Sequence, residues 1–351
     1  MSIEEKILVT GGCGFIGSNL LTYLLENYPE LSVVNLDLLT YAGKPENVAH
    51  LAKYQDRYEF IKGDICDGSL LKEIFSGHTI TGVMHLAAES HVDNSLERPA
   101  DFVQTNVQGT LQLLHAAWQS WFAAPFTPKA GCEANRFLHV STDEVYGSLG
   151  ETGLFSETTP YAPNSPYSAS KAGSDFLVRA WHHSYGLNVV TTNCSNNYGP
   201  RQDREKLIPT ILRKALQGES IPIYGDGKNV RDWLYVEDHC SGIMLAYKKG
   251  KPGETYNIGG RNERNNNEIV ATICAILDKV YPAGPNDKFD GQSYSELISY
   301  VKDRPGHDLR YAIDATKIEG ELGWQAAENF ESGIQKTVQW YLEKFQRGAF
   351  K

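Results

Sequence analysis

The sequence lacks long hydrophobic runs and paired cysteines. No apolar stretch reaches the ~18 residues that a membrane-spanning helix needs. The opening segment MSIEEKILVTGG runs directly into a predicted strand, without the layout of a secretory signal peptide. The six cysteines are scattered and form no C-x-x-C pair, which disfavours a zinc site and a disulfide framework. We therefore expect a protein of the reducing cytoplasm, with no metal and no membrane contact.

Positive charge is also scarce. The 351 residues include 33 Lys and Arg against 43 Asp and Glu, a formal net charge of −10. Proteins that bind nucleic acids in general are usually basic, so this class is disfavoured. An acidic surface is still compatible with a local basic pocket for a small anion.

Short apolar segments alternate with segments of helical periodicity in the first part of the chain. This order predicts an α/β fold, a doubly wound, Rossmann-like parallel sheet with right-handed crossovers. The expected strands are 6–11, 32–37, 58–65, 82–88, 136–142 and one beginning at 187, and the expected helices are 15–28, 106–121 and 165–186.

The alternation breaks after about Cys194, where shorter and more mixed segments follow. We expect residues 1–193 to form a dinucleotide-binding Rossmann domain, with about 228–258 returning to it. Residues 194–227 and 259–351 are expected to form a smaller, mixed α/β substrate lobe.

A glycine-rich turn joins the first strand to the first helix. The segment TGGCGFIGS places Gly11, Gly14 and Gly17 at G-x-x-G-x-x-G spacing, and Asp37 lies twenty residues after Gly17, at the end of the next strand. Glycines let a pyrophosphate approach the backbone at the helix N-terminus, and the acid can bind the ribose hydroxyls while repelling a 2′-phosphate. This context favours NAD over NADP, and it favours a dinucleotide site over a plain glycine turn. Cys13, inside the turn, is interpreted as a small residue that fits rather than as an activated thiol.

A tyrosine and a lysine in SPYSASKAG have the spacing of neighbours on one helix face. Tyr167 and Lys171 are i and i+4. A nearby ammonium favours the phenolate, so we expect Lys171 to lower the pKa of Tyr167 and make it a usable base. The pattern is common on helix surfaces, but its place after a dinucleotide turn and after VSTDEVYG favours a catalytic role.

The motifs TGGCGFIGS, HLAAESHVD, STDEVYG and PYSASKAG together resemble those of the extended short-chain dehydrogenase/reductase family, over nearly the whole chain. The segments NNYGPRQDREKLIPT, RDWLYVEDH and DRPGHDLRYAID are similar to those of its nucleotide-sugar 4,6-dehydratases. One departure is YAGK, with Lys44 where the family usually has YAGN, and its effect on the cofactor contact is left open.

The resemblance implies an NAD-dependent lyase that converts dTDP-glucose to dTDP-4-keto-6-deoxyglucose and water. The steps are oxidation at C4, elimination across C5 and C6, and return of the hydride to C6. It implies Glu144 as the base at C5, Asp143 as the acid for the C6 hydroxyl, and Thr142 as a partner of the C4 oxygen beside Tyr167. Mutual repulsion of the adjacent acids would keep one of them protonated. A helix N-cap formed by Asp143 is the structural alternative.

Further site residues are carried over from the family by position. For the cofactor they are Gly11, Gly14, Phe15, Ile16, Gly17, Asp37, Leu38, Leu39, Thr40, Asp64, Ile65, Leu86, Ala87, Ala88, Thr105, Tyr167, Lys171 and Asn197. For the nucleotide sugar they are Glu89, Ser90, Thr142, Asn196, Lys206, Leu207, Pro222, Tyr224, Arg231, Asn266, Asp303 and His307. Arg231 is the favoured bidentate partner of the diphosphate, and Tyr224 is a candidate for contact with the base.

Several other interpretations are kept. A nucleotide-sugar 4-epimerase or decarboxylase of the same family would share Tyr167 and Lys171, but an epimerase has no use for an acid pair that eliminates water. Another nucleotide-sugar 4,6-dehydratase is the nearest alternative. A catalytically silent NAD-sensing protein is opposed by the intact acid and Tyr–Lys pairs. By resemblance, we expect a homodimer through a four-helix bundle built from helices that contain 104–121 and 166–185.

Overall fold

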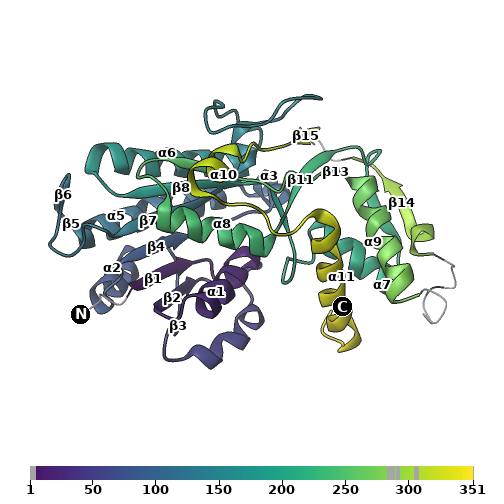
Figure 1. Cartoon of the computed structure of the whole chain (residues 1–351), viewed down its shortest axis with the longest axis horizontal. Helices are drawn as coiled ribbons and strands as arrows, with labels where there is room; N and C mark the ends of the chain where they lie inside the picture. Colours follow the sequence, from purple (N-terminus) through teal and green to yellow (C-terminus); the bar gives the residue numbers. More distant parts are fainter. Residues whose placement is uncertain (1–4, 283–288, 290–292, 304–307, 351) are drawn as a thin grey trace.

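A computed structural model describes residues 5–282, 289, 293–303 and 308–350. Its larger part is a seven-stranded sheet in the order β12-β8-β7-β4-β1-β2-β3, with every pairing parallel (Figure 1). The predicted α/β, doubly wound class is therefore confirmed. The strands are β1 (Glu5–Thr10), β2 (Leu31–Asp37), β3 (Tyr58–Lys62), β4 (Gly82–His85), β7 (Arg136–Thr142), β8 (Val189–Cys194) and β12 (Thr255–Ile258).

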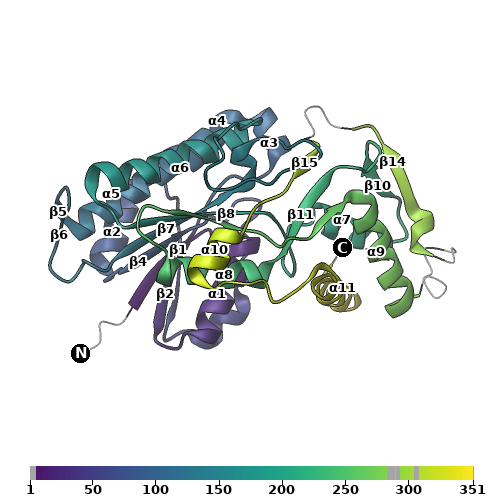
Figure 2. The same ribbon diagram turned by 45° about the horizontal axis from the view of Figure 1, so that its top comes forward.

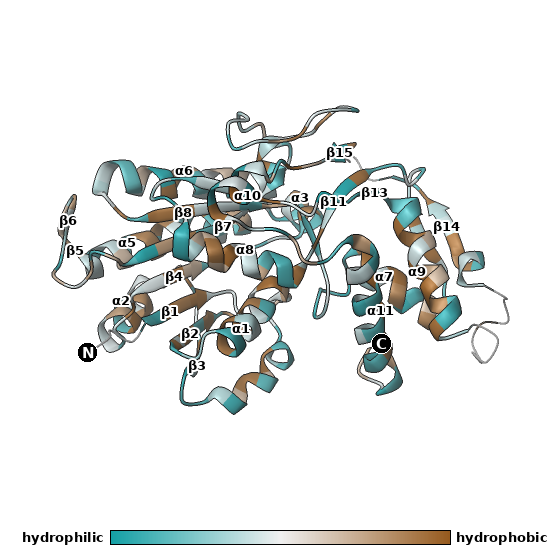
Figure 3. Cartoon of the chain, in the orientation of Figure 1, coloured by the Kyte–Doolittle hydropathy of each residue, from teal (hydrophilic) through white to brown (hydrophobic). Residues whose placement is uncertain are grey.

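Helices cover both faces of this sheet, which is why the central strands are apolar on both sides. One face packs against α1 (Phe15–Asn27), α8 (Val236–Lys249) and α10 (Thr316–Leu322). The other face packs against α2 (Gly68–Gly77), α5 (Thr110–Trp121) and α6 (Pro166–Tyr185). Figure 3 shows hydrophobic colouring on strands of the sheet and along the helices that flank it.

The second part of the chain packs around its own hydrophobic core, at one end of the large sheet (Figure 2). Two small sheets contribute: β10 pairs with β14, and β11 pairs with β9, β13 and β15. The elements are β9 (Asn196–Tyr198), α7 (Leu207–Leu216), β10 (Ile221–Tyr224), β11 (Val230–Tyr235), β13 (Glu263–Asn265), α9 (Asn266–Val280), η5 (Tyr294–Leu297), β14 (Ile298–Val301), β15 (Arg310–Tyr311) and α11 (Phe330–Gln346).

The chain crosses between the two parts more often than the predicted division assumes. β12 joins the large sheet and α8 packs on it, whereas β11, inside the same predicted segment, pairs with strands of the smaller part. α10 packs against α8 and β12 although it lies within the range predicted for the substrate lobe. The boundary between a cofactor domain and a substrate lobe stays a prediction.

The helix predicted at 106–121 begins earlier and is irregular. α4 (Pro99–Phe102) continues into the π-helical turn η3 (Val103–Gly109) and then into α5. The remaining short elements are η1 (Pro45–Asn47), η2 (Ala49–Tyr54), α3 (Val92–Glu97), the hairpin β5 (Phe122–Ala124) and β6 (Thr127–Pro128), and η4 (Asp143–Tyr146). Among the described residues, no helix combines the length and the apolar character of a membrane span.

Candidate active site

A pocket of about 490 Å³ lies at the carboxyl ends of the parallel strands. This is where doubly wound sheets bind their ligands, because the loops that leave neighbouring strands diverge there. Each of β1, β2, β3, β4, β7 and β8 sends the residues that follow it into the pocket wall, and β9 and the following loop complete it. Segments that are far apart in the sequence thus meet in one cavity.

The glycine-rich turn forms one end of the pocket. Gly11 has φ = +74°, and a Cβ there would lie 2.7 Å from backbone atoms of Ala87. A Cβ on Gly17 would lie 2.1 Å from the carbonyl oxygen of Gly11. Gly14 is the N-cap of α1 and has no side chain to cap the helix, so its first N–H groups can bind a phosphate. The turn therefore fits a dinucleotide pyrophosphate.

Asp37 holds this turn in place. Its Oδ2 accepts the N–H of Cys13 at 2.8 Å and its Oδ1 accepts the N–H of Leu39 at 2.8 Å. Asp37 lines the pocket, and each carboxylate oxygen has a second acceptor position, so ribose hydroxyls can bind the same group. The thiol of Cys13 is fully buried, and burial raises its pKa to about 12, in agreement with its interpretation as a space-filling residue.

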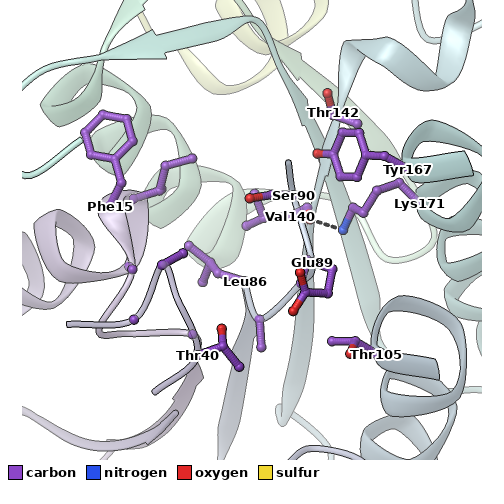
Figure 4. A pocket seen from close by; sticks show the side chains of 18 of the residues that line it. Phe15, Thr40, Leu86, Glu89, Ser90, Thr105, Val140, Thr142, Tyr167 and Lys171 are labelled. Atoms are coloured by element: carbon purple, nitrogen blue, oxygen red, sulfur yellow. Dashed lines mark hydrogen bonds between the residues drawn. The ribbon is translucent and has the colours of Figure 1, made fainter. Parts of the chain in front are cut away.

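Tyr167 and Lys171 enter the pocket from α6. That helix begins with a capping box at Ser165 and a proline at its first position, which fixes where the helix starts. The Nζ of Lys171 donates to the carbonyl oxygen of Val140 at 2.9 Å, and Thr142 lies next to the ring of Tyr167 (Figure 4). The predicted i, i+4 pair is thus placed inside the cavity, with Thr142 beside it.

The electrostatics of Tyr167 differ from the prediction. Burial, and then the negative charge of Glu144, raise the pKa of Tyr167 well above its ordinary value, while a hydrogen bond with Thr142 acts in the other direction. Burial also lowers the pKa of Lys171. The pKa of Tyr167 is therefore raised rather than lowered in this structure, because helical spacing does not show how completely both groups are removed from water. The predicted effect of Lys171 on the phenolate stays a prediction.

Asp175 is a buried partner of this pair that the sequence reasoning missed. It accepts hydrogen bonds from Ser141 Oγ at 2.8 Å and Tyr161 Oη at 3.0 Å, and His139 Nε2 lies 3.0 Å from its other oxygen. Its charge is the first cause that opposes the lowering of the Lys171 pKa. The signal was present in the sequence, since Asp175 follows Lys171 by one further i+4 step on the same helix face.

The acid pair lies at the end of β7, in the turn η4. Thr142, not Asp143, caps this turn by accepting the N–H of Glu144 at 3.3 Å, so the structural alternative of an Asp143 cap is wrong. Burial, then the charges of Glu144 and Asp232, raise the pKa of Asp143 well above its ordinary value, against the opposing charge of Arg231. Its Oδ2 is buried and accepts no hydrogen bond from the described residues. The environment of Asp143 therefore favours its protonated form.

All five predicted catalytic residues and most predicted cofactor residues line the pocket; Leu39 does not, because it packs against the hydrophobic core beside α1. Five residues predicted for the sugar line it: Glu89, Ser90, Thr142, Asn196 and Lys206. Its other lining residues were missed: Leu36, Ala42, Gly43, Gly63, Asp101, Gln104, Val140, Ser141, Cys194, Ser195, Gln202 and Asp203.

The other residues predicted for the nucleotide sugar belong to the smaller part and lie outside this pocket wall: Leu207, Pro222, Tyr224, Arg231, Asn266 and Asp303. Arg231 still acts on the site, because its charge lowers the pKa of Asp143. Its guanidinium lies 4.4 Å from the ring centre of Tyr311. Tyr224 is 48% exposed at the edge of the small sheet. His307 lies outside the described residues.

Comparison with known proteins identifies close relatives. The family profile described as GDP-mannose 4,6 dehydratase matches residues 8–337. A dTDP-glucose 4,6-dehydratase of Xanthomonas campestris pv. campestris (strain B100) is 58% identical over 336 residues, which are 95% of this chain and 92% of the relative.

Two solved structures of proteins with the same name are also similar. That from Bacillus anthracis, in complex with NAD, has a TM-score of 0.84 and 44% identity and covers 97% of this chain and 98% of its own. That from Streptomyces venezuelae, with NAD and a second ligand bound, has a TM-score of 0.85 and 43% identity and covers 99% of both chains.

The first prediction concerns Asp37. Asp37→Asn replaces a charged acceptor with a neutral amide, so NAD should bind about tenfold or more weakly and the preference for NAD over NADP should fall. Titration calorimetry with both nucleotides measures this. Asp67→Asn is the matched control, because Asp67 also accepts backbone N–H groups, at the start of α2, outside the pocket. Equal NAD affinity in Asp37→Asn and the parent protein would remove Asp37 from the ribose site.

The second prediction uses the raised pKa of Asp143. A buried acid with a raised pKa in the native state contributes fully to stability only below its pKa in the unfolded chain, which is near ~4. This contribution is lost as the pH rises through the pKa of the native state. Asp143→Asn removes the charge, so its Tm relative to the parent protein should be higher at about pH 8 than at about pH 5. Thermal melts at both pH values test this, and a Tm difference independent of pH would contradict it.

Proposed function

The chain belongs to the GDP-mannose 4,6 dehydratase family, and we propose that it converts dTDP-glucose to dTDP-4-keto-6-deoxyglucose and water with NAD as its cofactor. The observation that carries this proposal is the acid pair after β7, with Asp143 buried next to Glu144 in a pocket that fits a dinucleotide, where burial and the charge of Glu144 raise the pKa of Asp143. Elimination of water needs one base and one acid at the same time. A 4-epimerase has no elimination step and therefore needs no such acid pair.

The first step is oxidation at C4. Tyr167 accepts the proton of the C4 hydroxyl, with Thr142 hydrogen-bonding the same oxygen. NAD, when bound, takes the hydride from C4 and later supplies it to C6. Because burial raises the pKa of Tyr167, the phenolate requires nearby positive charge, and Lys171, one turn further along α6 and supported by Asp175, is placed to provide it.

The second step is elimination across C5 and C6. The new C4 carbonyl acidifies the C5 proton, which Glu144 removes. Asp143 gives its proton to the C6 hydroxyl, so the C6–O bond breaks and water leaves. The hydride then adds to C6 while C5 takes a proton from Glu144, whose acquired proton has exchanged with solvent. No net oxidation remains, because the electrons removed at C4 return at C6.

The nucleotide part of the substrate is proposed to reach the smaller part of the chain, with Arg231 at the diphosphate. Its charge already acts on Asp143 in the pocket, which supports a diphosphate bound close to the reacting sugar. Lys206 and Asn196, both in the pocket wall, are further donors.

A homodimer is proposed through the helices η3, α5 and α6. Large apolar side chains on this side of the molecule are exposed: Leu96, Val103 and Phe176 are each more than half exposed, which supports an interface there. A cytoplasmic location remains a prediction; the six cysteines are all free, which suits a reducing compartment.

The third prediction separates the partial reactions. Asp143→Asn and Glu144→Gln should still oxidise C4, seen as bound NADH, but formation of the 6-deoxy product should fall by ~10²–10⁴-fold, as on loss of a general acid or base. Asp238→Asn is the matched control: Asp238 is as buried as Asp175 and accepts the backbone N–H groups of Ala327 and Glu328, outside the pocket. Product formation at the parent rate in both variants would overturn the assignment of the pair.

The fourth prediction follows the hydride. dTDP-glucose deuterated at C4 should give product deuterated at C6, while C5 acquires hydrogen from solvent. Mass spectrometry and NMR of the product locate the label. Retention of the C6 hydroxyl throughout would mean epimerisation instead, and loss of the label to solvent would exclude one bound cofactor as the carrier.

A further inference from the structure

Two loops from distant parts of the sequence line the same pocket. The loop after β2 contributes Leu38, Thr40, Ala42 and Gly43 to the wall, and the loop after β9 contributes Gln202, Asp203 and Lys206. The first loop also follows Asp37, which bonds the glycine-rich turn. A dinucleotide bound along this turn therefore lies between the two loops.

An ion pair joins these loops at the rim. Lys44 Nζ lies 2.9 Å from Asp203 Oδ2, and the side chains are 41% and 18% exposed. Lys44 is the residue that departs from the family's YAGN pattern. The longer, charged side chain of Lys44 reaches a carboxylate 159 positions away in the sequence.

Both ends of the pair are anchored. The N–H of Lys44 donates to the carbonyl oxygen of Cys13 in the glycine-rich turn at 3.0 Å. Asp203 holds its own turn, since its Oδ1 accepts the N–H of Glu205 and its carbonyl oxygen accepts the N–H of Lys206, each at 3.0 Å. The ion pair therefore links two ordered backbones rather than two free side chains.

The second loop is also fixed at its base. Asn19 of α1 donates to the carbonyl oxygen of Pro200 at 2.9 Å, and Arg201 donates to Asn19 Oδ1 at 2.6 Å. These bonds and the ion pair are all partly buried, but the side chain of Lys44, at 41% exposure, keeps contact with solvent. Breaking the ion pair would leave these bonds in place, together with those that Gln202 makes with Asn197 and Tyr341, so only the side-chain link between the two loops would be lost.

We propose that the Lys44–Asp203 ion pair is a latch that keeps the two loops closed over bound NAD and so slows its release. The inference rests on the proposed function, in which the cofactor removes a hydride at C4 and must stay bound until it is returned at C6. A reduced cofactor that escaped between the steps would strand the oxidised sugar. The latch affects the residence time of the bound cofactor, whereas the hydrogen bonds of the glycine-rich turn affect its orientation.

The test measures cofactor release directly. Protein loaded with NADH is mixed with excess NAD, and the loss of NADH fluorescence gives the release rate. Lys44→Ala and Asp203→Ala should each release NADH about two- to fivefold faster, the range expected for a partly exposed pair worth up to about 1 kcal/mol. The double variant should be no faster than either single one, because both remove the same interaction.

A charge swap and a salt series sharpen the test. Lys44→Asp combined with Asp203→Lys should restore slow release, and the difference between parent protein and Lys44→Ala should shrink as salt screens the pair. Lys53→Ala is the matched control, since Lys53 pairs with Glu26 at 3.4 Å, both outside the pocket. Unchanged release in Lys44→Ala, or additive effects in the double variant, would overturn the latch.

Failure of the latch can be told apart from failure of the proposed function. If NADH binds and leaves at the same rate in all variants while dTDP-glucose is still dehydrated, only the latch is wrong. If no variant and no parent protein binds NADH, the proposed function fails as well. With saturating NAD in solution, Lys44→Ala should still make the 6-deoxy product, because neither residue of the pair contacts the reacting groups.

Discussion

The exclusion of water from the carboxyl end of β7 is the constraint on which the chemistry depends. Asp143, at 3% exposure, faces the charges of Glu144 and Asp232 with little solvent to separate them. Two adjacent carboxyls in water would both ionise near neutral pH. With Asp143 buried and Glu144 half-buried beside it, the environment favours the protonated form of Asp143, as the proposed division into an acid and a base requires.

The fold excludes water from the carboxyl end of β7 by bringing the two parts of the chain together there. The turn η4, which follows β7, supplies the acid pair, α6 supplies Tyr167 and Lys171, and β11 of the smaller part supplies Asp232 and Arg231. Asp232 raises the pKa of Asp143 and Arg231 lowers it. The protonation of the acid is thus set partly by residues that reach it only because the smaller part packs on the sheet. A diphosphate bound at Arg231 would weaken the opposing effect and favour the proton on Asp143.

Local patterns predicted the parts of this site that a few neighbouring residues determine. The glycine-rich turn, the acid after β2 and the i, i+4 spacing of Tyr167 and Lys171 each follow from backbone geometry over one turn or one strand end. The raised pKa of Tyr167 was not predicted, because burial is a property of the whole fold. Gln104 reaches the pocket through a π-helical turn that ordinary helical periodicity does not indicate.

The buried site and its rim differ in how strongly solvent screens their charges. Inside the pocket, burial and then neighbouring charges raise the pKa values of Asp143 and Tyr167 well above their ordinary values. At the rim, Lys44 and Asp203 keep contact with solvent, so their attraction is weak and sensitive to salt. A weak, reversible contact suits a boundary that must open for the cofactor to enter. In the proposed latch, the weak contact thus lies where the cofactor enters and leaves, whereas the strong electrostatic effects lie among the buried groups of the pocket.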